Sequence, residues 1–512
     1  MTTSTIVILA TIGVYLLGMV IIGIAFSKKN KNSDDFYLGG RKLGPLVTAM
    51  SAEASDMSGW LLMGLPAVAL MTGLPEAFWT ALGLSVGTYL NWLFVAKRLR
   101  VYSQKIDAFT LPDFFSRRFG DKAHIITAIS AIFIVIFFVP YTASGFAACG
   151  KLFSSLFGMD YMTAMLLSAA VIVLYCTLGG FLAASTTDFI QSIVMTIALV
   201  VVLGFSEGVT NGFGNVFANV SQLDGYMDLF KGFSVADGTT MSYGALPVAS
   251  TLAWGLGYFG MPHILLRFMA IEDENKLKIS RRVASVWVVI SMAVAVLIGI
   301  TGYSLMKNGI IPTYADASAA ETIIVDIAKV ISAYGYIPAF VGGIILAGIL
   351  ASTMSTADSQ LLAAASSISQ NLVQETFRVK LSEKKSLWIA RISVILISVV
   401  AVFLASDPNS SVFQIVSFAW AGFGAVFGPV MLFSLFWKRA NKWGALAGML
   451  VGGITVLVWK LVIRNIFAGT VLDFYELLPA FILACVAVVV GSLATAAPEK
   501  EITDVFDEVK AK

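Results

Sequence analysis

The sequence predicts an all-α polytopic membrane protein, and three observations support that prediction. Hydrophobic residues make up 58% of the 512-residue chain and charged residues only 13%, whereas a soluble domain has roughly a quarter of its residues charged. Apolar runs of about 20 residues, long enough to cross a hydrocarbon core of about 30 Å, recur along the chain. Basic residues gather in alternate loops between these runs. We therefore expect one membrane domain over 1–496 and a short, charged cytoplasmic tail over 497–512 that is frayed.

The apolar runs predict about thirteen transmembrane helices. They cover 5–26, 44–73, 77–97, 124–154, 161–183, 187–208, 246–266, 281–305, 336–372, 386–405, 412–436, 443–463 and 475–495. The second, fourth and ninth runs are longer than a bilayer requires, so each is tilted, extended beyond the membrane or interrupted. No basic region or cleavage site accompanies the first run, which is therefore a retained span and not a signal peptide.

Lysine and arginine are concentrated in five groups of loop residues. An even number of predicted spans lies between each group and the next. The groups comprise Lys28, Lys29, Lys31, Arg41 and Lys42, then residues from Lys97 to Lys122, from Arg267 to Arg282, from Arg378 to Lys385, and from Lys438 to Lys442. The positive-inside rule places such loops in the cytoplasm. The prediction is an outside N-terminus and a cytoplasmic C-terminus in the plasma membrane, with Lys460 and Arg464 as a mild exception on the outer side.

Several classes of function are disfavoured by composition. A net charge of +3 is too small to indicate nucleic-acid binding. Cys149, Cys176 and Cys485 have no pairing or metal-site spacing and are expected to be small core residues. With two histidines, no phosphate loop and no hydrolase elbow, the chain is predicted to be neither an enzyme nor a holder of a cofactor.

Charges within membrane spans are functional candidates, because each costs about 2.5 to 3.5 kcal/mol near a helix centre. Asp56 lies midway along the second run, in a stretch dense in small and hydroxyl residues. That composition favours an unwound helix whose freed carbonyls, with the carboxylate, hold a small cation. The alternative is a structural ion pair, for instance with Arg41. Glu53, one turn earlier, is expected nearer the helix end, facing water.

Two further stretches are candidates for ion binding. Between Ser352 and Gln360 the hydroxyls recur at spacings that put several on one helical face. Such hydroxyls also join helices by hydrogen bonds, but the additional Asp358 favours ion coordination. Asp188 opens the sixth run and is either an N-terminal cap, part of an ion relay, or both.

Three glycines and a proline between Ala253 and His263 predict a broken helix within the seventh run. The GxGxxG match inside it lacks the strand–helix unit of a dinucleotide site. Trp254 and Tyr258 are one turn apart, and we favour a shared pocket over an interfacial aromatic belt. The glycines from Gly422 to Gly428 indicate close helix packing. The interrupted runs 44–73 and 246–266 lie five spans apart and enter from opposite sides, as an inverted repeat requires.

Several of these motifs closely resemble the sodium/proline symporters of the sodium:solute symporter family. The motifs are Leu38 to Arg41, Ser51 to Pro66 apart from Glu53, Trp254 to His263, Met354 to Thr356, and Trp443 to Gly448. The resemblance covers nearly the whole chain. It implies a leucine-transporter-type five-plus-five inverted repeat, 44–208 against 246–436, that imports L-proline with sodium by alternating access.

The resemblance also implies roles for individual residues. Sodium would be bound by the carbonyls of Ala54, Met57 and Ser352 and by the hydroxyls of Ser355 and Thr356. Asp56 and Asp188 would support ion coupling, and Arg41 would lie at the cytoplasmic gate. The proline pocket would be formed by Ser58, Gly59, Tyr141, Trp254, Tyr258 and Pro262. Enteric carriers of this kind have glycine at the position of Glu53, alanine at Ser352 and no counterpart of Asp358, so a second cation or a proton is an alternative.

Other readings remain at this point. The chain could be a sodium symporter for another small amino acid or a compatible solute, which pocket residues outside the motifs would decide. A sensor usually adds a soluble signalling domain, and the tail is too short for one. A channel needs a continuous pore, and no filter-like repeat occurs in the sequence.

Overall fold

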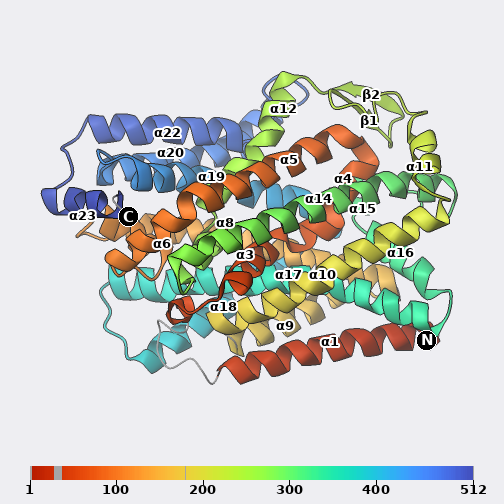
Figure 1. Cartoon of the computed structure of the whole chain (residues 1–512), viewed down its shortest axis with the longest axis horizontal. Helices are drawn as coiled ribbons and strands as arrows, with labels where there is room; N and C mark the ends of the chain where they lie inside the picture. The colour runs from red at the N-terminus through yellow and green to blue at the C-terminus, as the bar shows by residue number, and fades with distance from the viewer. Residues whose placement is uncertain (1–2, 28–36, 179, 511–512) are drawn as a thin grey trace.

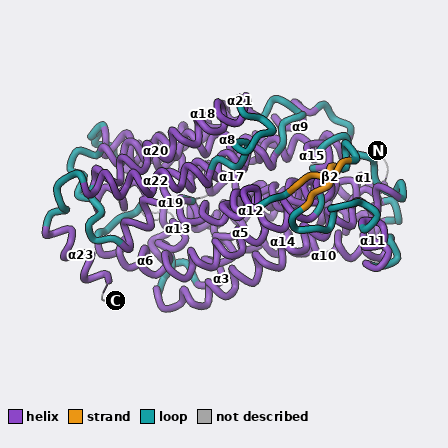
Figure 2. The backbone as a smooth tube through the Cα atoms, turned by 90° about the horizontal axis from the view of Figure 1, so that it is seen from above, coloured by secondary structure: helices purple, strands orange, loops and turns teal. Residues whose placement is uncertain are grey.

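The computed structural model describes residues 3–27, 37–178 and 180–510. Lys28, Lys29 and Lys31, on which the predicted orientation partly depends, lie outside the described residues. Most of the long helices run along the long axis of the molecule (Figure 1). A small hairpin of strands β1 (Lys231–Ser234) and β2 (Thr239–Ser242) lies at one end of the bundle, which we call the hairpin end. The last helix, α23 (Lys500–Lys510), lies at the other, the C-terminal end (Figure 2).

The remaining helices follow one another with short connections. The first half contains α1 (Thr3–Ser27), η1 (Gly39–Arg41), α3 (Pro45–Gly59), η2 (Trp60–Gly64), α4 (Leu65–Thr72), α5 (Leu74–Leu90), η3 (Asn91–Val95), α6 (Ala96–Lys105), α7 (Leu111–Arg118), α8 (Ile125–Phe157), α9 (Tyr161–Leu178), α10 (Phe181–Val209) and α11 (Phe213–Val220). The second half contains α12 (Ala245–Leu252), η4 (Ala253–Gly260), α13 (Pro262–Ala270), η5 (Glu274–Lys276), α14 (Leu277–Lys307), α15 (Ala317–Ala320), α16 (Ile323–Ser332), α17 (Tyr336–Ser366), η6 (Ser367–Thr376), α18 (Glu383–Leu404), α19 (Val412–Phe436), α20 (Lys442–Val458), η7 (Trp459–Ile463), α21 (Arg464–Ile466) and α22 (Leu477–Leu493).

The fold class is all-α, as predicted. Within the described residues, nine helical segments are long and apolar enough to cross a membrane, and α9 and α22 contain shorter apolar helices. The predicted spans at 77–97 and 246–266 fall on α5–α6 and on the broken pair α12–α13. The count of thirteen spans therefore stays a prediction.

Burial separates a central element from peripheral ones. The most apolar stretch of α3–α4 is 100% buried, whereas that of α1 is 22% buried and that of α18 33%. Large apolar side chains such as Val14 and Phe403 are exposed on these outer helices. An apolar surface of this extent is stable against lipid and not against water. The second span is thus the core of the bundle, where α10, α14 and α17 pack on α3.

Both predicted breaks are present. Ser58 has φ 49° and ψ −171°, which interrupts the helical path between α3 and the π-helical turn η2. The seventh span changes from α12 to the 3-10 segment η4 and then to an extended Met261 before Pro262 starts α13. The predicted close packing is also present, because a Cβ on Gly424 would approach the Gly257 Cα to 2.9 Å. The long runs 124–154 and 336–372 are by contrast unbroken over α8 and α17.

The prediction of a frayed tail is wrong. Residues 500–510 form α23, in which Phe506 and Val509 are buried against the C-terminal end of the bundle. Phe506 packs over the guanidinium of Arg118, 5.1 Å from the ring centroid. Apolar residues at 502, 505, 506 and 509 share one face of the helix, and that periodicity gives the segment a docking surface despite its high charge.

Candidate functional site

The break in the second span faces hydroxyl groups of α17. The Ser355 hydroxyl donates to the Ala54 carbonyl at 2.8 Å and lies 3.2 Å from the Ser352 carbonyl. The Thr356 hydroxyl donates to the same Ser352 carbonyl at 3.0 Å. Hydrogen bonds therefore bring the oxygen atoms of four of the five predicted sodium ligands together. The fifth, the Met57 carbonyl, accepts the Trp60 N–H in the turn after the break.

Asp56 lies beside this cluster and is buried, with tyrosines as its polar partners. The Tyr258 hydroxyl of η4 donates to Asp56 Oδ2 at 2.7 Å, and the Tyr141 hydroxyl of α8 donates to the Asp56 carbonyl at 2.9 Å. Asp56 Oδ1 is buried without a hydrogen-bond partner among the described residues. Tyr258 thus holds one carboxylate oxygen and Tyr141 holds the backbone of the same residue. The second carboxylate oxygen is available to a cation.

The alternative ion pair between Asp56 and Arg41 does not form. Arg41 is at the C-terminal end, where its guanidinium donates to the Met269 and Ala108 carbonyls, both at 2.7 Å. It also contacts Ser103, and so joins η1 to the ends of α6 and α13. Arg41 therefore lies at the base-rich end of the bundle, and its role at a gate stays a prediction.

Asp188 belongs to a buried ionic cluster. The helix α10 starts at Phe181, with Gly180 in the capping position, so the N-cap alternative for Asp188 is wrong. Asp188 Oδ2 instead accepts from the Ser51 hydroxyl at 2.7 Å and from Arg267 Nη2 at 3.1 Å. Arg267, counted above as a loop base, is in fact buried in α13 because that helix continues past the glycine-rich break.

Asp358 lies next to the same guanidinium through Ser359. Arg267 Nη2 donates to the Ser359 hydroxyl at 2.5 Å, and that hydroxyl lies 3.2 Å from Asp358 Oδ1. Asp358 Oδ2 and Asp188 Oδ1 are buried without hydrogen-bond partners in the described part of the chain. Two carboxylates therefore share one cation in the core of the bundle.

Glu53 does not face water, so that prediction is wrong. The residue is fully buried, and Glu53 Oε1 accepts from the Trp92 indole at 2.8 Å and from the Thr88 hydroxyl at 3.1 Å. Both donors come from the α5–η3 helix that packs beside the break. The distance of a residue from the helix end does not indicate its exposure in the second span, because other helices enclose the whole span.

Trp254 lies in an aromatic cluster near the hairpin end. Its ring centroid is 5.1 Å from that of Tyr475 and 5.5 Å from those of Trp60 and Phe413. Trp254 and Tyr258 are both buried, which excludes the interfacial-belt alternative. Trp254 lines a polar cavity of about 540 Å³, which we call the outer cavity.

The other predicted pocket residues lie at the two breaks. Ser58 carries the non-helical backbone, and its hydroxyl accepts the Trp60 N–H at 3.0 Å. A Cβ on Gly59 would lie 3.0 Å from Ala148 Cβ, so glycine is required for the approach of α8. Pro262 is the first residue of α13 and is buried, as is Met261 before it.

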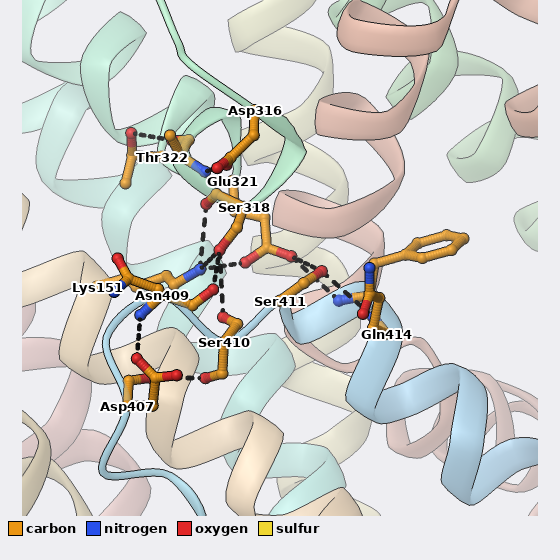
Figure 3. Close-up of polar contacts among 12 residues, drawn as sticks. Lys151, Asp316, Ser318, Glu321, Thr322, Asp407, Asn409, Ser410, Ser411 and Gln414 are labelled. Atoms are coloured by element: carbon orange, nitrogen blue, oxygen red, sulfur yellow. Dashed lines mark hydrogen bonds and ion pairs between the residues drawn. The ribbon is translucent and has the colours of Figure 1, made fainter. Parts of the chain in front are cut away.

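One wall of the outer cavity is fixed by a buried ion pair (Figure 3). Lys151 Nζ of α8 lies 2.6 Å from Glu321 Oε2 and donates to the Ser318 hydroxyl at 2.8 Å. Glu321 Oε1 accepts from the Ser411 hydroxyl at 2.9 Å and from the Phe413 N–H at 3.1 Å. The α15–α16 segment is thereby tied to α8 and to the start of α19.

Comparisons with known proteins find matches over nearly the whole chain. The sodium:solute symporter family matches residues 36–452. The chain is 42% identical over 496 residues to the osmoregulated proline transporter of Bacillus subtilis, covering 96% of each chain. It is 41% identical over 514 residues to the sodium/proline symporter of Escherichia coli, covering 98% of this chain and 96% of that one.

The fold is that of a solved sodium-coupled sialic acid symporter in a substrate-bound, outward-open state. The two structures superpose with a TM-score of 0.77 at 17% identity, over 96% of this chain and 99% of the other. A transporter of the nucleobase–cation symport-1 family in a closed conformation matches with a TM-score of 0.51 at 13% identity. These likenesses establish the leucine-transporter-type architecture.

Proposed function

Because the chain belongs to the sodium:solute symporter family, we propose that it is a secondary active transporter that imports L-proline together with sodium. The observation that carries this proposal is the break at Ser58 opposite Ser355 and Thr356. Relatives at about 40% identity over nearly the full chain are named sodium/proline symporters. Such a function needs no catalytic group, because transport by alternating access forms and breaks no covalent bond.

The sodium ion is bound where α3 breaks beside α17. The ligands in this proposal are the carbonyls of Ala54, Met57 and Ser352 and the hydroxyls of Ser355 and Thr356. Oxygen donors of this kind suit a hard monovalent cation, and a broken helix supplies carbonyls that are not used in the helix. Asp56 and Asp188 contribute negative charge near the ion and couple its binding to the substrate.

Proline binds between the two broken spans. The pocket in this proposal consists of Ser58, Gly59, Tyr141, Trp254, Tyr258 and Pro262. The Tyr258–Asp56 hydrogen bond supports it, because that bond joins the substrate side of η4 to the ion side of α3. The aromatic faces of Trp254 and Tyr258 offer apolar area to the pyrrolidine ring.

The two broken spans lie in the repeats 44–208 and 246–436, which we propose to be inverted copies that move against each other. The hairpin end faces the outside and the end with α23 and Arg41 faces the cytoplasm. The base-rich loops at the latter end support this orientation, as does the outer cavity that leads to Trp254. An outer cavity together with tight contacts around Arg41 corresponds to an outward-facing arrangement.

Sodium coupling gives the import its driving force. A tenfold sodium gradient contributes about 1.4 kcal/mol, and a potential of about 100 mV adds about 2.3 kcal/mol for the single moving charge. Proline itself is a zwitterion without net charge. The combined force supports an accumulation of a few hundredfold.

Uptake of labelled L-proline into proteoliposomes tests the function. We expect accumulation under an inward sodium gradient that increases with an inside-negative potential, because sodium carries the charge. The control is a potassium medium at the same voltage and pH. Equal uptake from both media would exclude sodium coupling, and sodium-driven uptake of another solute without competition by proline would exclude proline as the substrate.

A further inference from the structure

The outer cavity has the size and the chemistry of a ligand site in its own right. Its volume of about 540 Å³ lies within the range of small-molecule sites, about 300 to 1,000 Å³. Five elements at the hairpin end contribute a charged side chain to its lining: α5, the loop before α16, η7, α21 and the loop before α22.

Most of the ionised groups around this cavity already have partners. Glu321 is paired with Lys151. Arg464 contacts Asp473 Oδ1 and Glu476 Oε2, both at 3.0 Å. These groups form the fixed walls and are not available to a ligand without breaking an ion pair.

Two lining groups differ from the rest. Within the part of the chain that the structure describes, neither the Lys460 ammonium nor the Glu76 carboxylate has a hydrogen bond or an ion-pair contact, although both are partly buried. Lys460 is carried by the π-helical turn η7, and Glu76 lies in the first turn of α5. We call these two groups uncommitted because no described partner contacts them directly, although Arg464 acts on Glu76, and Glu476 and Asp473 act on Lys460, at longer range.

The floor of the cavity is aromatic. Trp254 and Tyr475 stack with an interplanar angle of 21°, and Phe413 packs against Trp254 at 5.5 Å. The Tyr475 hydroxyl donates to the Ser417 carbonyl at 2.9 Å, which fixes the ring. A small apolar ring can lie on this floor with its charged groups directed to the walls.

We propose that the outer cavity is an encounter site for a zwitterionic amino acid, occupied before the ligand passes Trp254 into the pocket between the broken spans. Lys460 receives the carboxylate, Glu76 receives the ammonium group, and the aromatic floor receives the ring. This proposal rests on the proposed function. It adds a second site, at which the protein recognises the two opposite charges of the amino acid. A zwitterion satisfies both uncommitted groups at once, whereas an anion or a cation alone leaves one of them unpaired.

Initial rates of sodium-driven proline uptake in proteoliposomes test the site with Lys460→Gln and Glu76→Gln. Each substitution should raise the KM for proline about fivefold, the effect of losing one partly exposed ion pair, with little change in maximal rate. The control variants are Lys307→Gln and Glu207→Gln, charges at the same end of the molecule that do not line the cavity. Both controls should leave KM unchanged.

Two half-ligands separate charge recognition from a structural effect. Cyclopentanecarboxylate lacks the amine, and prolinamide lacks the carboxylate. Lys460→Gln should weaken inhibition by cyclopentanecarboxylate and spare inhibition by prolinamide, and Glu76→Gln should do the reverse. A salt or folding effect would change both inhibitors alike and overturn the proposal, as would an unchanged KM in both variants or a lack of inhibition of the wild-type protein by either compound. Sodium-driven proline uptake by the same wild-type vesicles is measured separately, so the encounter site can fail while the transport function stands.

Discussion

Asp56 is held by neutral hydroxyls and not by a basic side chain. Tyr258 satisfies Oδ2, and Oδ1 has no hydrogen-bond partner among the described residues. An isolated carboxylate is costly to bury, so in the ionised state it requires a positive charge nearby. The oxygen cluster formed by Ala54 of α3 and by Ser352 and Ser355 of α17 lies close by and supplies a place for that charge.

Asp56→Asn should abolish sodium-dependent proline uptake while the protein remains folded and inserted. Asparagine keeps the size and the acceptor for Tyr258 but removes the charge that attracts the cation, a loss of several kcal/mol in a low-dielectric site. The measurement is proline binding to the purified variant as a function of sodium concentration. We expect half-saturation to shift to much higher sodium.

Asp56→Glu is the matched variant for this experiment. It keeps the charge and displaces it by one methylene, so partial activity at raised sodium is expected. If Asp56 were purely structural, the asparagine variant would lose thermal stability and its surviving fraction would bind sodium normally. An unchanged sodium dependence in folded Asp56→Asn protein would remove Asp56 from the ion pathway.

Arg267 illustrates why residue roles are hard to infer from sequence. Its partner Asp188 is 79 positions away in the chain, and a pair between distant spans has no local signal. The hydropathy of the seventh run gave the approximate end of a span, but it did not indicate that α13 would carry its arginine into the core. The participation of Asp358 in ion binding stays a prediction, supported by its buried place beside Arg267 and Ser359.

At the scale of elements, the broken seventh span is held between two glycine-lined helices. A Cβ on Gly87 of α5 would meet the Gly255 carbonyl oxygen at 2.3 Å, and a Cβ on Gly260 would meet the Phe423 carbonyl oxygen of α19 at 2.2 Å. Backbone therefore packs directly on backbone at both crossings. Close approach of this kind is how membrane helices gain packing energy without a hydrophobic driving force.

Gly255→Ala should destabilise the protein and impair transport. The added methyl group would lie 2.2 Å from the Gly83 carbonyl oxygen, so α5 must move away from η4. Overpacking of a core typically costs about 1 to 3 kcal/mol. Thermal unfolding of the purified protein, measured with uptake, checks the effect.

Gly204→Ala provides the control at an equally helical position. Apart from the backbone of its own helix, no described atom lies within 4 Å of where a Cβ on Gly204 would be, and alanine is the better helix former. Stability should be unchanged or rise by up to about 1 kcal/mol. Equal destabilisation by both substitutions would mean that glycine is needed for helix flexibility and not for the close crossing.

Sequence composition predicted both breaks because glycine, proline and hydroxyl residues are dense there and rare in ordinary spans. It could not predict which turn would deform. Ser58 takes a positive φ although the adjoining Gly59 is the residue better suited to it. Packing explains the difference: Gly59 is needed where α8 and α17 approach, because a Cβ at this position would lie 3.0 Å from Ala148 Cβ and 3.5 Å from Thr353 Oγ1.

At the scale of the whole molecule, the bilayer requirement made the fold predictable. Long apolar runs have few structural solutions in lipid, and the long helices lie where hydropathy placed them. The wrong predictions for Glu53 and Asp188 have different causes. Glu53 was misplaced because hydropathy does not show which neighbours enclose a span. The cap interpretation of Asp188 failed because α10 begins at Phe181, before the boundary that hydropathy indicated.

The docking of α23 closes the C-terminal end, and apolar burial holds it there. Two ion pairs, Lys105 with Glu508 and Lys438 with Asp507, lie at its edge with about half of each side chain exposed. Exposed pairs contribute roughly 0 to 1 kcal/mol each and are screened by salt. Phe506 is 5% exposed and covers Arg118, whose terminal nitrogens are buried without hydrogen-bond partners among the described residues.

Phe506→Ala should therefore release α23 from the bundle, whereas the double variant Asp507→Asn, Glu508→Gln should leave it docked. Truncating a well-buried phenylalanine costs about 3 to 5 kcal/mol, more than the two exposed pairs together, and it also opens the Arg118 guanidinium to water. Hydrogen–deuterium exchange of residues 500–510 in the reconstituted protein measures the docking directly. Protection should fall steeply in the alanine variant and persist in the charge variant, also at high salt. If the charge variant lost protection as fully as Phe506→Ala, ion pairing would hold the helix, and the apolar face of α23 would be incidental.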